Sequence, residues 1–477
     1  MNPKPDQSVI KTNGRFKRYN LDAEIAEPEN AAKELLSSDL PARSGAEWAF
    51  SHQSKTRIKG CKRPQSSRYQ IVSNDKPESR VLSGMRPTGR LHLGHYHGVL
   101  KNWVQLQHEY DCLFFVADWH ALTSHYEDTA EIEESVWQMV IDWLAAGVNP
   151  SSTTLFIQSR VPEHAELHLL LSMITPLSWV ERVPTFKDQV SRNKDRDLAT
   201  YGFLGYPILQ SSDILIYRAG LVPVGADQVP HVEMTREIAR RFNHIFGRDA
   251  GFEDAAEQAV KKLGRKHAGL YRELRKQYME QGSEEALAKA QSLVSDSGNL
   301  SLGDRDRLLG YAEGSGRIIL PESQALLTEN PVMPGLDGQK MSKSYNNTIS
   351  LREEPDSVTQ KIKTMTTDPA RVKRTDPGEP TKCPVFDLHK IYSDEATCEW
   401  VTEGCRSAGI GCIDCKAPLA ESILAEQQPM RERALQFEQN PDLVRSIIAE
   451  GCEKARAQAR ATLEEVRSVM GLDYRSL

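Results

Sequence analysis

The sequence has no apolar run long enough to cross a membrane, and its start carries no secretion-signal pattern. It also lacks a strong excess of charge: the 477 residues carry a net charge of −6, with a pI near 6.2. These absences argue against a membrane protein and against nucleic-acid binding through an overall positive field. We therefore expect a cytoplasmic protein in which any polyanion is bound by local patches.

A chain of 477 residues is too long for one simple core, so we expect two or three domains. Residues 1–78 are polar and aperiodic, which predicts a disordered or weakly ordered extension. Strand-like and helix-like segments alternate through residues 79–349, which predicts an α/β fold with a Rossmann-type parallel sheet. A charged stretch at about 248–318 is interpreted as a helical insertion, and residues 350–477 as an appended all-α domain.

The first chemical motif, His92-Leu93-Gly94-His95, follows a predicted strand at 80–84 and a turn bracketed by two glycines. From His92 onward, apolar residues recur at helical spacing. A strand, a glycine turn and a helix N-terminus form an anion site, because unpaired backbone N–H groups point at the anion. Both imidazoles can donate hydrogen bonds to it. The alternative is a helix that merely begins with two surface histidines.

The second motif is Lys340-Met341-Ser342-Lys343-Ser344, and it follows a loop that contains Gly335 and Gly338. Lysines and serines on a loop with two glycine hinges can close over a triphosphate and later release pyrophosphate. A solvated basic loop is the alternative interpretation.

In this order, with strand–helix alternation between them, the two motifs resemble the paired ATP-binding motifs of class I aminoacyl-tRNA synthetases. The strings at 205–217, 222–228 and 231–243 look like the tryptophanyl-tRNA synthetase core, and they resemble the tyrosyl core less closely. The resemblance runs from about 84 to 247, resumes near residue 320 and reaches 469–472. It omits the extension and the insertion.

This resemblance implies a tryptophan–tRNA ligase that activates L-tryptophan with ATP and Mg²⁺ and then transfers it to tRNA(Trp). It also implies a homodimer, with residues 350–477 as the anticodon-binding domain. A tyrosine-specific ligase is the nearest alternative. A non-catalytic RNA-binding paralogue is a second alternative. It is disfavoured because both ATP motifs are intact.

The resemblance assigns catalytic roles to His92, His95, Lys340 and Lys343. The residues that it assigns to ATP are Arg86, Pro87, Thr88, Gly94, His95, Gly225, Ala226, Asp227, Val332, Lys340, Met341, Ser342, Lys343 and Ser344. The family usually has Glu where this chain has Ala226, so ATP affinity depends on whether that contact is made by backbone or side chain.

Asp213 is the residue expected to read the amino-acid side chain. It is expected at the beginning of an apolar helix, where a carboxylate needs a partner, and an indole N–H can be that partner. A site built around this donor rejects Phe, which would leave the carboxylate unpaired. A charge at the helix N-terminus, favoured by the helix dipole, is the alternative role for Asp213. Gln228 is expected to contact tryptophan as well.

Five of the eight cysteines lie between Cys383 and Cys415. Cys383, Cys405, Cys412 and Cys415 have spacing that suits either tetrahedral zinc or a [4Fe–4S] cluster. Similar spacing in some bacterial tryptophanyl-tRNA synthetases implies the iron–sulfur cluster, with Zn²⁺ as the alternative and Cys398 as the alternative fourth ligand. A basic run just before the cluster is a candidate for tRNA phosphate contacts. It comprises Lys361, Lys363, Arg371, Lys373 and Arg374.

Overall fold

The computed structural model describes residues 79–126, 129–183, 200–248, 251–327 and 332–474, so the prediction for residues 1–78 lies outside the described residues. The described segments belong to one compact unit, residues 69–477. None of the helices in these segments is long and apolar enough to cross a membrane.

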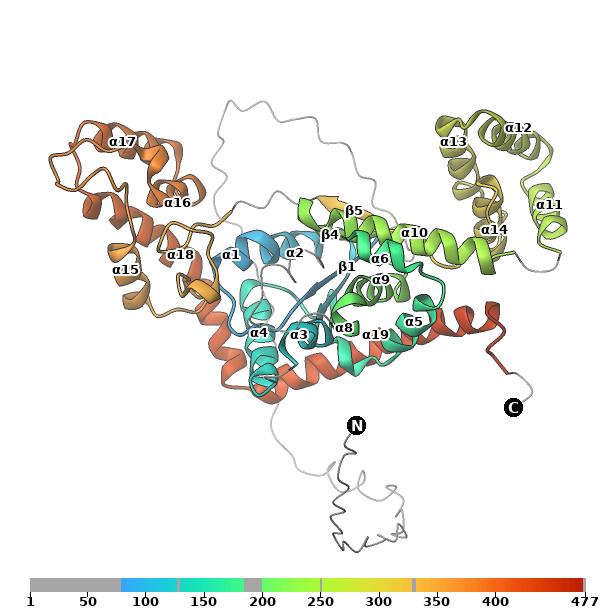
Figure 1. The fold of residues 1–477 in the computed structure, drawn as a ribbon, viewed down its shortest axis with the longest axis horizontal. Helices are drawn as coiled ribbons and strands as arrows, with labels where there is room; N and C mark the ends of the chain where they lie inside the picture. Colours follow the sequence, from blue (N-terminus) through green and yellow to red (C-terminus); the bar gives the residue numbers. More distant parts are fainter. Residues whose placement is uncertain (1–78, 127–128, 184–199, 249–250, 328–331, 475–477) are drawn as a thin grey trace, which may run out of the picture. The chain divides into compact units, whose positions relative to one another are not determined.

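The described part of the chain is built around a five-stranded parallel sheet in the order β3-β2-β1-β4-β5 (Figure 1). This arrangement confirms the predicted Rossmann-type α/β fold. The order reverses beside β1, so the crevice at the carboxyl ends of β1 and β4 is the expected ligand site. The strands are β1 Arg80–Met85, β2 Asp111–Val116, β3 Thr153–Ile157, β4 Leu221–Val224 and β5 Gln324–Leu327.

Helices connect the strands and cover the sheet. The predicted helix from His92 is interrupted, because a π-helical turn separates two short α-helices. The first group is α1 Leu93–His95, η2 Tyr96–Leu100, α2 Lys101–Leu106, α3 Asp118–His125, α4 Ile132–Ala146 and η3 Gln158–Arg160. The second group is α5 Glu163–Ser172, α6 Leu177–Arg182, α8 Tyr201–Leu204, α9 Tyr206–Ile216, η4 Ala226–Gln228 and α10 Val229–Phe246.

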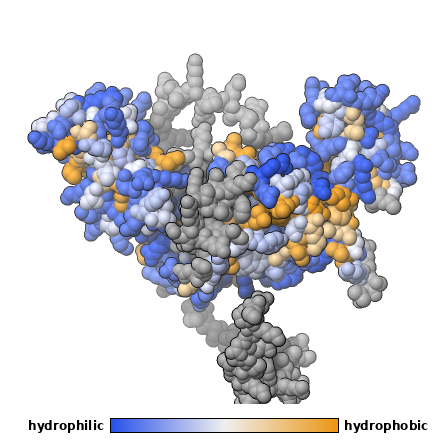
Figure 2. Space-filling model, viewed as in Figure 1, coloured by the Kyte–Doolittle hydropathy of each residue, from blue (hydrophilic) through white to orange (hydrophobic). Residues whose placement is uncertain are grey.

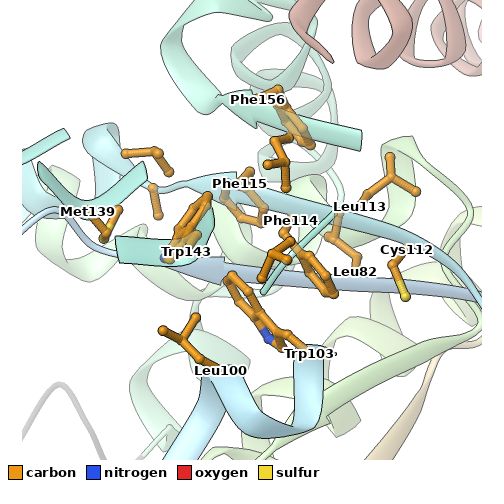
Figure 3. Packing of buried hydrophobic residues seen from close by; sticks show 14 of the residues in the cluster. Leu82, Leu100, Trp103, Cys112, Leu113, Phe114, Phe115, Met139, Trp143 and Phe156 are labelled. Atoms are coloured by element: carbon orange, nitrogen blue, oxygen red, sulfur yellow. The ribbon is translucent and has the colours of Figure 1, made fainter. Parts of the chain in front are cut away.

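Aromatic packing fixes α2 and α4 to the central strands (Figure 3). The fully buried ring of Trp103 stacks on Phe114 of β2, with centroids 4.1 Å apart and planes 2° apart. Trp143 of α4 meets the same indole edge-on at 5.1 Å. Such large buried rings dominate core energetics, so they hold the segment around the first motif against the sheet.

The insertion is helical, as predicted, and has a separate apolar core that includes the buried side chains of Tyr271 and Leu308. Its entry and exit lie together, because a Cβ on Gly316 would come within 2.6 Å of the Gly247 Cα. The helices of the insertion are α11 Phe252–Lys262, α12 Arg265–Gln281, α13 Glu284–Ser295 and α14 Leu302–Ala312.

The carboxyl-terminal part is helical, as predicted. Its elements are η5 Lys343–Tyr345, α15 Pro355–Thr364, η6 Pro380–Lys382, α16 Pro384–Tyr392, α17 Glu395–Arg406, α18 Cys412–Glu438 and α19 Pro441–Val469. Apolar residues of α18 and α19 belong to the same buried cluster as the sheet. Helix α19 crosses β3 so closely that a Cβ on Gly451 would lie 1.8 Å from the Leu155 carbonyl oxygen. The helix thereby covers an edge strand that would otherwise expose unpaired backbone groups.

Candidate functional site

The first motif forms a short, tightly capped turn after β1. The Gly94 backbone N–H donates to His92 Nδ1 at 3.1 Å, and the His92 N–H donates to His95 Nδ1 at 3.3 Å. The two imidazole centroids are 3.8 Å apart. These bonds leave the Nε2 atom of each ring for other partners, so both rings can still face an anion at the helix N-terminus.

The second motif is held in place by Asn347. Its Oδ1 accepts from the Ser342 N–H at 2.8 Å, and its Nδ2 donates to the Lys340 carbonyl at 3.2 Å. A Cβ on Gly335 would collide with the Asn347 amide at 2.2 Å, so glycine is required there. Met341 is buried, and its N–H donates to the Met333 carbonyl at 2.9 Å. The loop is therefore a preformed structure with anchored backbone.

The structure brings the two motifs together. Lys343 Nζ donates to the Thr88 carbonyl at 2.7 Å, across the turn that precedes the first motif. The Leu93 N–H donates to the Ile349 carbonyl at 3.0 Å, which ties α1 to the segment after the lysine loop. Two motifs about 250 residues apart in the sequence therefore lie side by side in the structure.

Burial lowers the pKa of three titratable side chains in this region. Burial lowers the pKa of His95 to about 2, with further lowering by His92, Lys343 and Lys340. Burial together with the two lysines lowers the pKa of His92 to about 4. Burial also lowers the pKa of Lys343 to about 8, against a raising effect of Asp142. The imidazoles are thus neutral at pH 7 and Lys343 is largely cationic.

A single cavity at the carboxyl ends of β1 and β4 gathers six of the predicted substrate residues. They are Arg86, Thr88, His95, Asp213, Gly225 and Gln228. The other predicted residues lie outside its lining, including Val332, which is 69% exposed. These are Pro87, His92, Gly94, Ala226, Asp227, Val332, Lys340, Met341, Ser342, Lys343 and Ser344. Gly84 opens the floor of the cavity, because a Cβ there would overlap the Phe115 ring at 2.4 Å.

Asp213 is a buried carboxylate at this cavity, with 1% of its surface exposed. His164 Nδ1 and Gln158 Nε2 contact its Oδ1 at 2.6 and 2.8 Å. His120 Nε2 contacts Oδ2 at 2.7 Å. Burial raises the pKa of Asp213, but the charges and hydrogen bonds of the two histidines outweigh it and hold that pKa well below its usual range. Asp213 is therefore an ionised, pre-positioned acceptor. It lies in the last turn of α9 and not at the helix beginning that was predicted, and the helix dipole disfavours a negative charge there. The alternative role as a charge at the helix N-terminus is therefore wrong.

Sequence reasoning missed the residues that hold Asp213. His120 lies in the first turn after β2, Gln158 directly follows β3, and His164 lies in the helix after that. The sequence does show that these residues are polar and follow predicted strands. Such residues are candidates for the site, because the carboxyl ends of parallel strands meet at the ligand crevice. Which of them converge depends on the strand order, which the sequence pattern does not reveal.

The four predicted ligand cysteines converge. Cys383, Cys405, Cys412 and Cys415 line one small apolar cavity, whereas the Cys398 Sγ contacts the His389 carbonyl. Among the residues that the structure describes, no group of three or more His, Cys, Asp or Glu side chains is arranged so that it could hold a metal ion. Cys112 and Cys452 are buried elsewhere, and Cys61 lies outside the described residues.

The basic run before the cysteines divides into two kinds of side chain. Lys363, Lys373 and Arg374 are exposed. Arg371 is buried, and it donates to the Ile410 carbonyl at 2.5 Å and to Cys405 Sγ at 3.7 Å. The prediction of a surface phosphate contact is therefore wrong for Arg371, because its guanidinium braces the loop beside the cysteines.

Comparison with known proteins gives a consistent result. The family described as tRNA synthetases class I (W and Y) matches residues 74–259 and 307–426. The tryptophan–tRNA ligase of Ralstonia nicotianae is 67% identical over 395 residues, covering 83% of this chain and 99% of that protein. Its counterpart in Thermotoga maritima is 42% identical over 397 residues, covering 83% of this chain and 100% of that protein.

Among solved structures, the tryptophanyl-tRNA synthetase of Campylobacter jejuni in complex with ADP and tryptophan superposes with a TM-score of 0.61 at 26% identity. The match covers 82% of this chain and 100% of that one. This chain belongs to the tryptophanyl-tRNA synthetases, a class I family.

Proposed function

We propose that this protein is a tryptophan–tRNA ligase, and the observation that carries the proposal is the ionised, buried Asp213 in a cavity that His95 and Thr88 also line. In the first step a tryptophan carboxylate oxygen attacks the α-phosphorus of ATP, and the bond to the β-phosphate oxygen breaks. Pyrophosphate leaves with Mg²⁺. In the second step a tRNA 3′-terminal hydroxyl attacks the acyl carbon, the bond from that carbon to the phosphate oxygen breaks, and AMP leaves with the bonding electrons and takes up the hydroxyl proton.

The two ATP motifs supply the charge that the first step needs. Lys343 Nζ lies 2.7 Å from the Thr88 carbonyl, so its ammonium group is fixed at the edge of the cavity. We assign Lys340 and Lys343 to the negative charge that develops on the departing pyrophosphate, and His92 and His95 to the phosphate oxygens. Fixed donors at developing charge provide the largest share of catalysis in such transfers. We propose that the other residues assigned to ATP in the sequence analysis contact ATP as well.

Asp213 is assigned to the tryptophan side chain, and Gln228 to the polar end of the amino acid. Replacing Asp213 by Asn keeps the shape and removes the negative charge. We expect Asp213→Asn to charge tRNA with tryptophan about 10- to 100-fold less efficiently, which corresponds to the loss of one charged hydrogen bond. The assay measures ATP-dependent transfer of labelled tryptophan to tRNA. An unchanged kcat/KM for tryptophan would contradict the assignment.

We further propose that Cys383, Cys405, Cys412 and Cys415 hold a [4Fe–4S] cluster. A zinc ion draws four sulfurs onto one atom at about 2.3 Å each, whereas a cluster spreads them over four irons. Four thiols around a shared cavity support a thiolate-held metal site, and the resemblance of their spacing to that of other tryptophanyl-tRNA synthetases favours the cluster over zinc. The cluster would cross-link η6, α16, α17 and α18, a structural role separate from the ATP motifs.

The cluster can be tested by colour and iron content. Protein purified without oxygen should be brown, with about four irons per chain. Cys412→Ser or Cys415→Ser should remove the colour, and the matched control Cys398→Ser should keep it, because Cys398 points at a backbone carbonyl instead of the cavity. A colourless wild-type protein with one zinc would contradict the proposal.

We assign residues 79–349 to the catalytic domain and residues 350–477 to the domain that binds the tRNA anticodon. We assign the whole protein to the cytoplasm. The exposed Lys363, Lys373 and Arg374, which precede the four cysteines in the sequence, support phosphate contacts in this part of the chain. A homodimer is supported by an apolar surface over α5 and α6 (Figure 2). It contains Leu169, Met173 and Leu177, which are 54%, 67% and 59% exposed. A monomeric mass in solution would contradict the dimer.

A further inference from the structure

Gln210 is a polar side chain of the amino-acid cavity that the assignments above leave unused. Tyr206, Gln210 and Asp213 are spaced four and three residues apart on α9, so they share one helix face. All three line the cavity. The Oε1 of Gln210 is buried and accepts no hydrogen bond from any described residue. A buried acceptor without a donor is costly, so a donor from a bound molecule is the natural complement.

The neighbouring carboxylate of Asp213 has few hydrogen-bond acceptor positions left. A carboxylate offers about four acceptor positions. Gln158 and His164 occupy Oδ1 of Asp213, and His120 occupies one position on Oδ2. An incoming N–H at Asp213 therefore finds one open position on Oδ2, and the carbonyl oxygen of Gln210 stands one helical turn away on the same face.

We propose that Gln210 is a specificity-determining residue whose Oε1 accepts the indole N–H of tryptophan together with Asp213. This inference rests on the proposed function. On α9, Gln210 stands one turn before Asp213 and Ile214, which together offer a charged acceptor and an apolar wall. That combination suits an indole ring. The α-ammonium group is attached to the carbon that carries the reacting carboxylate, so it belongs near the ATP motifs instead.

The test pairs an enzyme variant with a substrate analogue. Pyrophosphate exchange is measured with tryptophan and with β-(1-benzothiophen-3-yl)alanine, in which sulfur replaces the indole N–H. Gln210→Leu should lower kcat/KM for tryptophan at least tenfold and change that for the analogue less than threefold. Gln210→Glu retains an acceptor and should recover most of the activity with tryptophan. Thermal unfolding monitors folding, and Gln210→Met replaces the leucine variant if the latter is unfolded.

Two outcomes would overturn the inference while leaving the proposed function intact. An equal loss with both substrates would mean that Gln210 only shapes the pocket or binds the ammonium group. Unchanged kinetics would mean that another acceptor, such as the buried His120 Nδ1, meets the indole. A wild-type protein that cannot activate tryptophan at all would overturn the proposed function itself, and the inference with it.

Discussion

Lys343 combines burial with a role that requires positive charge. Burial lowers the pKa of its amine to about 8, and Asp142 only partly opposes that effect. In free enzyme the ammonium form therefore prevails below pH 8 and is lost above it. Because kcat/KM reports the free enzyme, we predict that kcat/KM for ATP falls as the pH rises through about 8.

The matched control for this prediction is Lys343→Arg, since a guanidinium stays charged across the whole range. The variant should lose the decline above pH 8, whatever its absolute rate. Steady-state kinetics from pH 6.5 to 9.5 measure both profiles. A decline of the same size and midpoint in the arginine variant would assign the titration to another group.

His95 links the site to stability at low pH. Its pKa in the folded protein, about 2, lies below the ordinary value of 6.5, because burial and nearby positive charge disfavour protonation. As the pH falls below 6.5, the unfolded chain takes up a proton that the folded chain does not. Stability is therefore fully present above pH 6.5 and declines below it.

His95→Asn removes this contribution. The free energy of unfolding of the variant, relative to wild type, should rise by up to about 2 kcal/mol between pH 7 and pH 5. Urea titrations of both proteins at the two pH values measure that difference. A relative stability that stays constant with pH would show that His95 titrates normally in the folded protein.

At the scale of elements, much of the sheet could be predicted from its apolar runs. The strand predicted at 80–84 is β1, and β2 is shifted by two residues from the start of the apolar run at 113–117 that marks it in the sequence. The shift arises because β2 begins at Asp111, whose carboxylate pairs with Arg80 at 2.8 Å on the neighbouring strand. A polar pair at a strand start carries no apolar signal.

The site was predictable only in part, because some of its residues come from segments that are far apart in the sequence. The two ATP motifs are continuous strings, so they could be located directly. The acceptor site at Asp213 instead draws His120, Gln158 and His164 from three other segments. Their meeting depends on the order of the strands, and hydrophobic periodicity does not contain that information.

The crossing of α19 over β3 depends on one glycine. A Cβ on Gly451 would lie 1.8 Å from the Leu155 carbonyl oxygen, so the helix would have to shift. We predict that Gly451→Ala lowers the free energy of unfolding by at least about 3 kcal/mol, the upper part of the range for overpacking.

The control is Gly269→Ala, which lies inside α12 with open space around the added carbon. It should instead raise stability by up to about 1 kcal/mol through helix propensity. Chemical denaturation of both variants gives the comparison. Equal effects of the two substitutions would show that α19 does not press on β3 as described.

At the scale of the whole molecule, His95 of the first motif and the buried carboxylate of Asp213 line one cavity at the parallel sheet, and Lys343 of the second motif contacts Thr88 of that lining. The four cysteines gather instead in the carboxyl-terminal helices. This separation means that amino-acid activation and the cysteine site can be examined independently. Loss of the proposed cluster should therefore reduce tRNA charging and leave activation largely intact.

The most direct test of the proposed function is ATP–pyrophosphate exchange without tRNA, run separately with each standard amino acid. Three hydrogen-bond partners hold the ionised Asp213 at the cavity, where we propose that it accepts the indole N–H of tryptophan. We predict that tryptophan supports exchange at least 100-fold better than tyrosine or phenylalanine, as hydrogen-bond-based rejection permits. Comparable exchange with tyrosine would contradict the account.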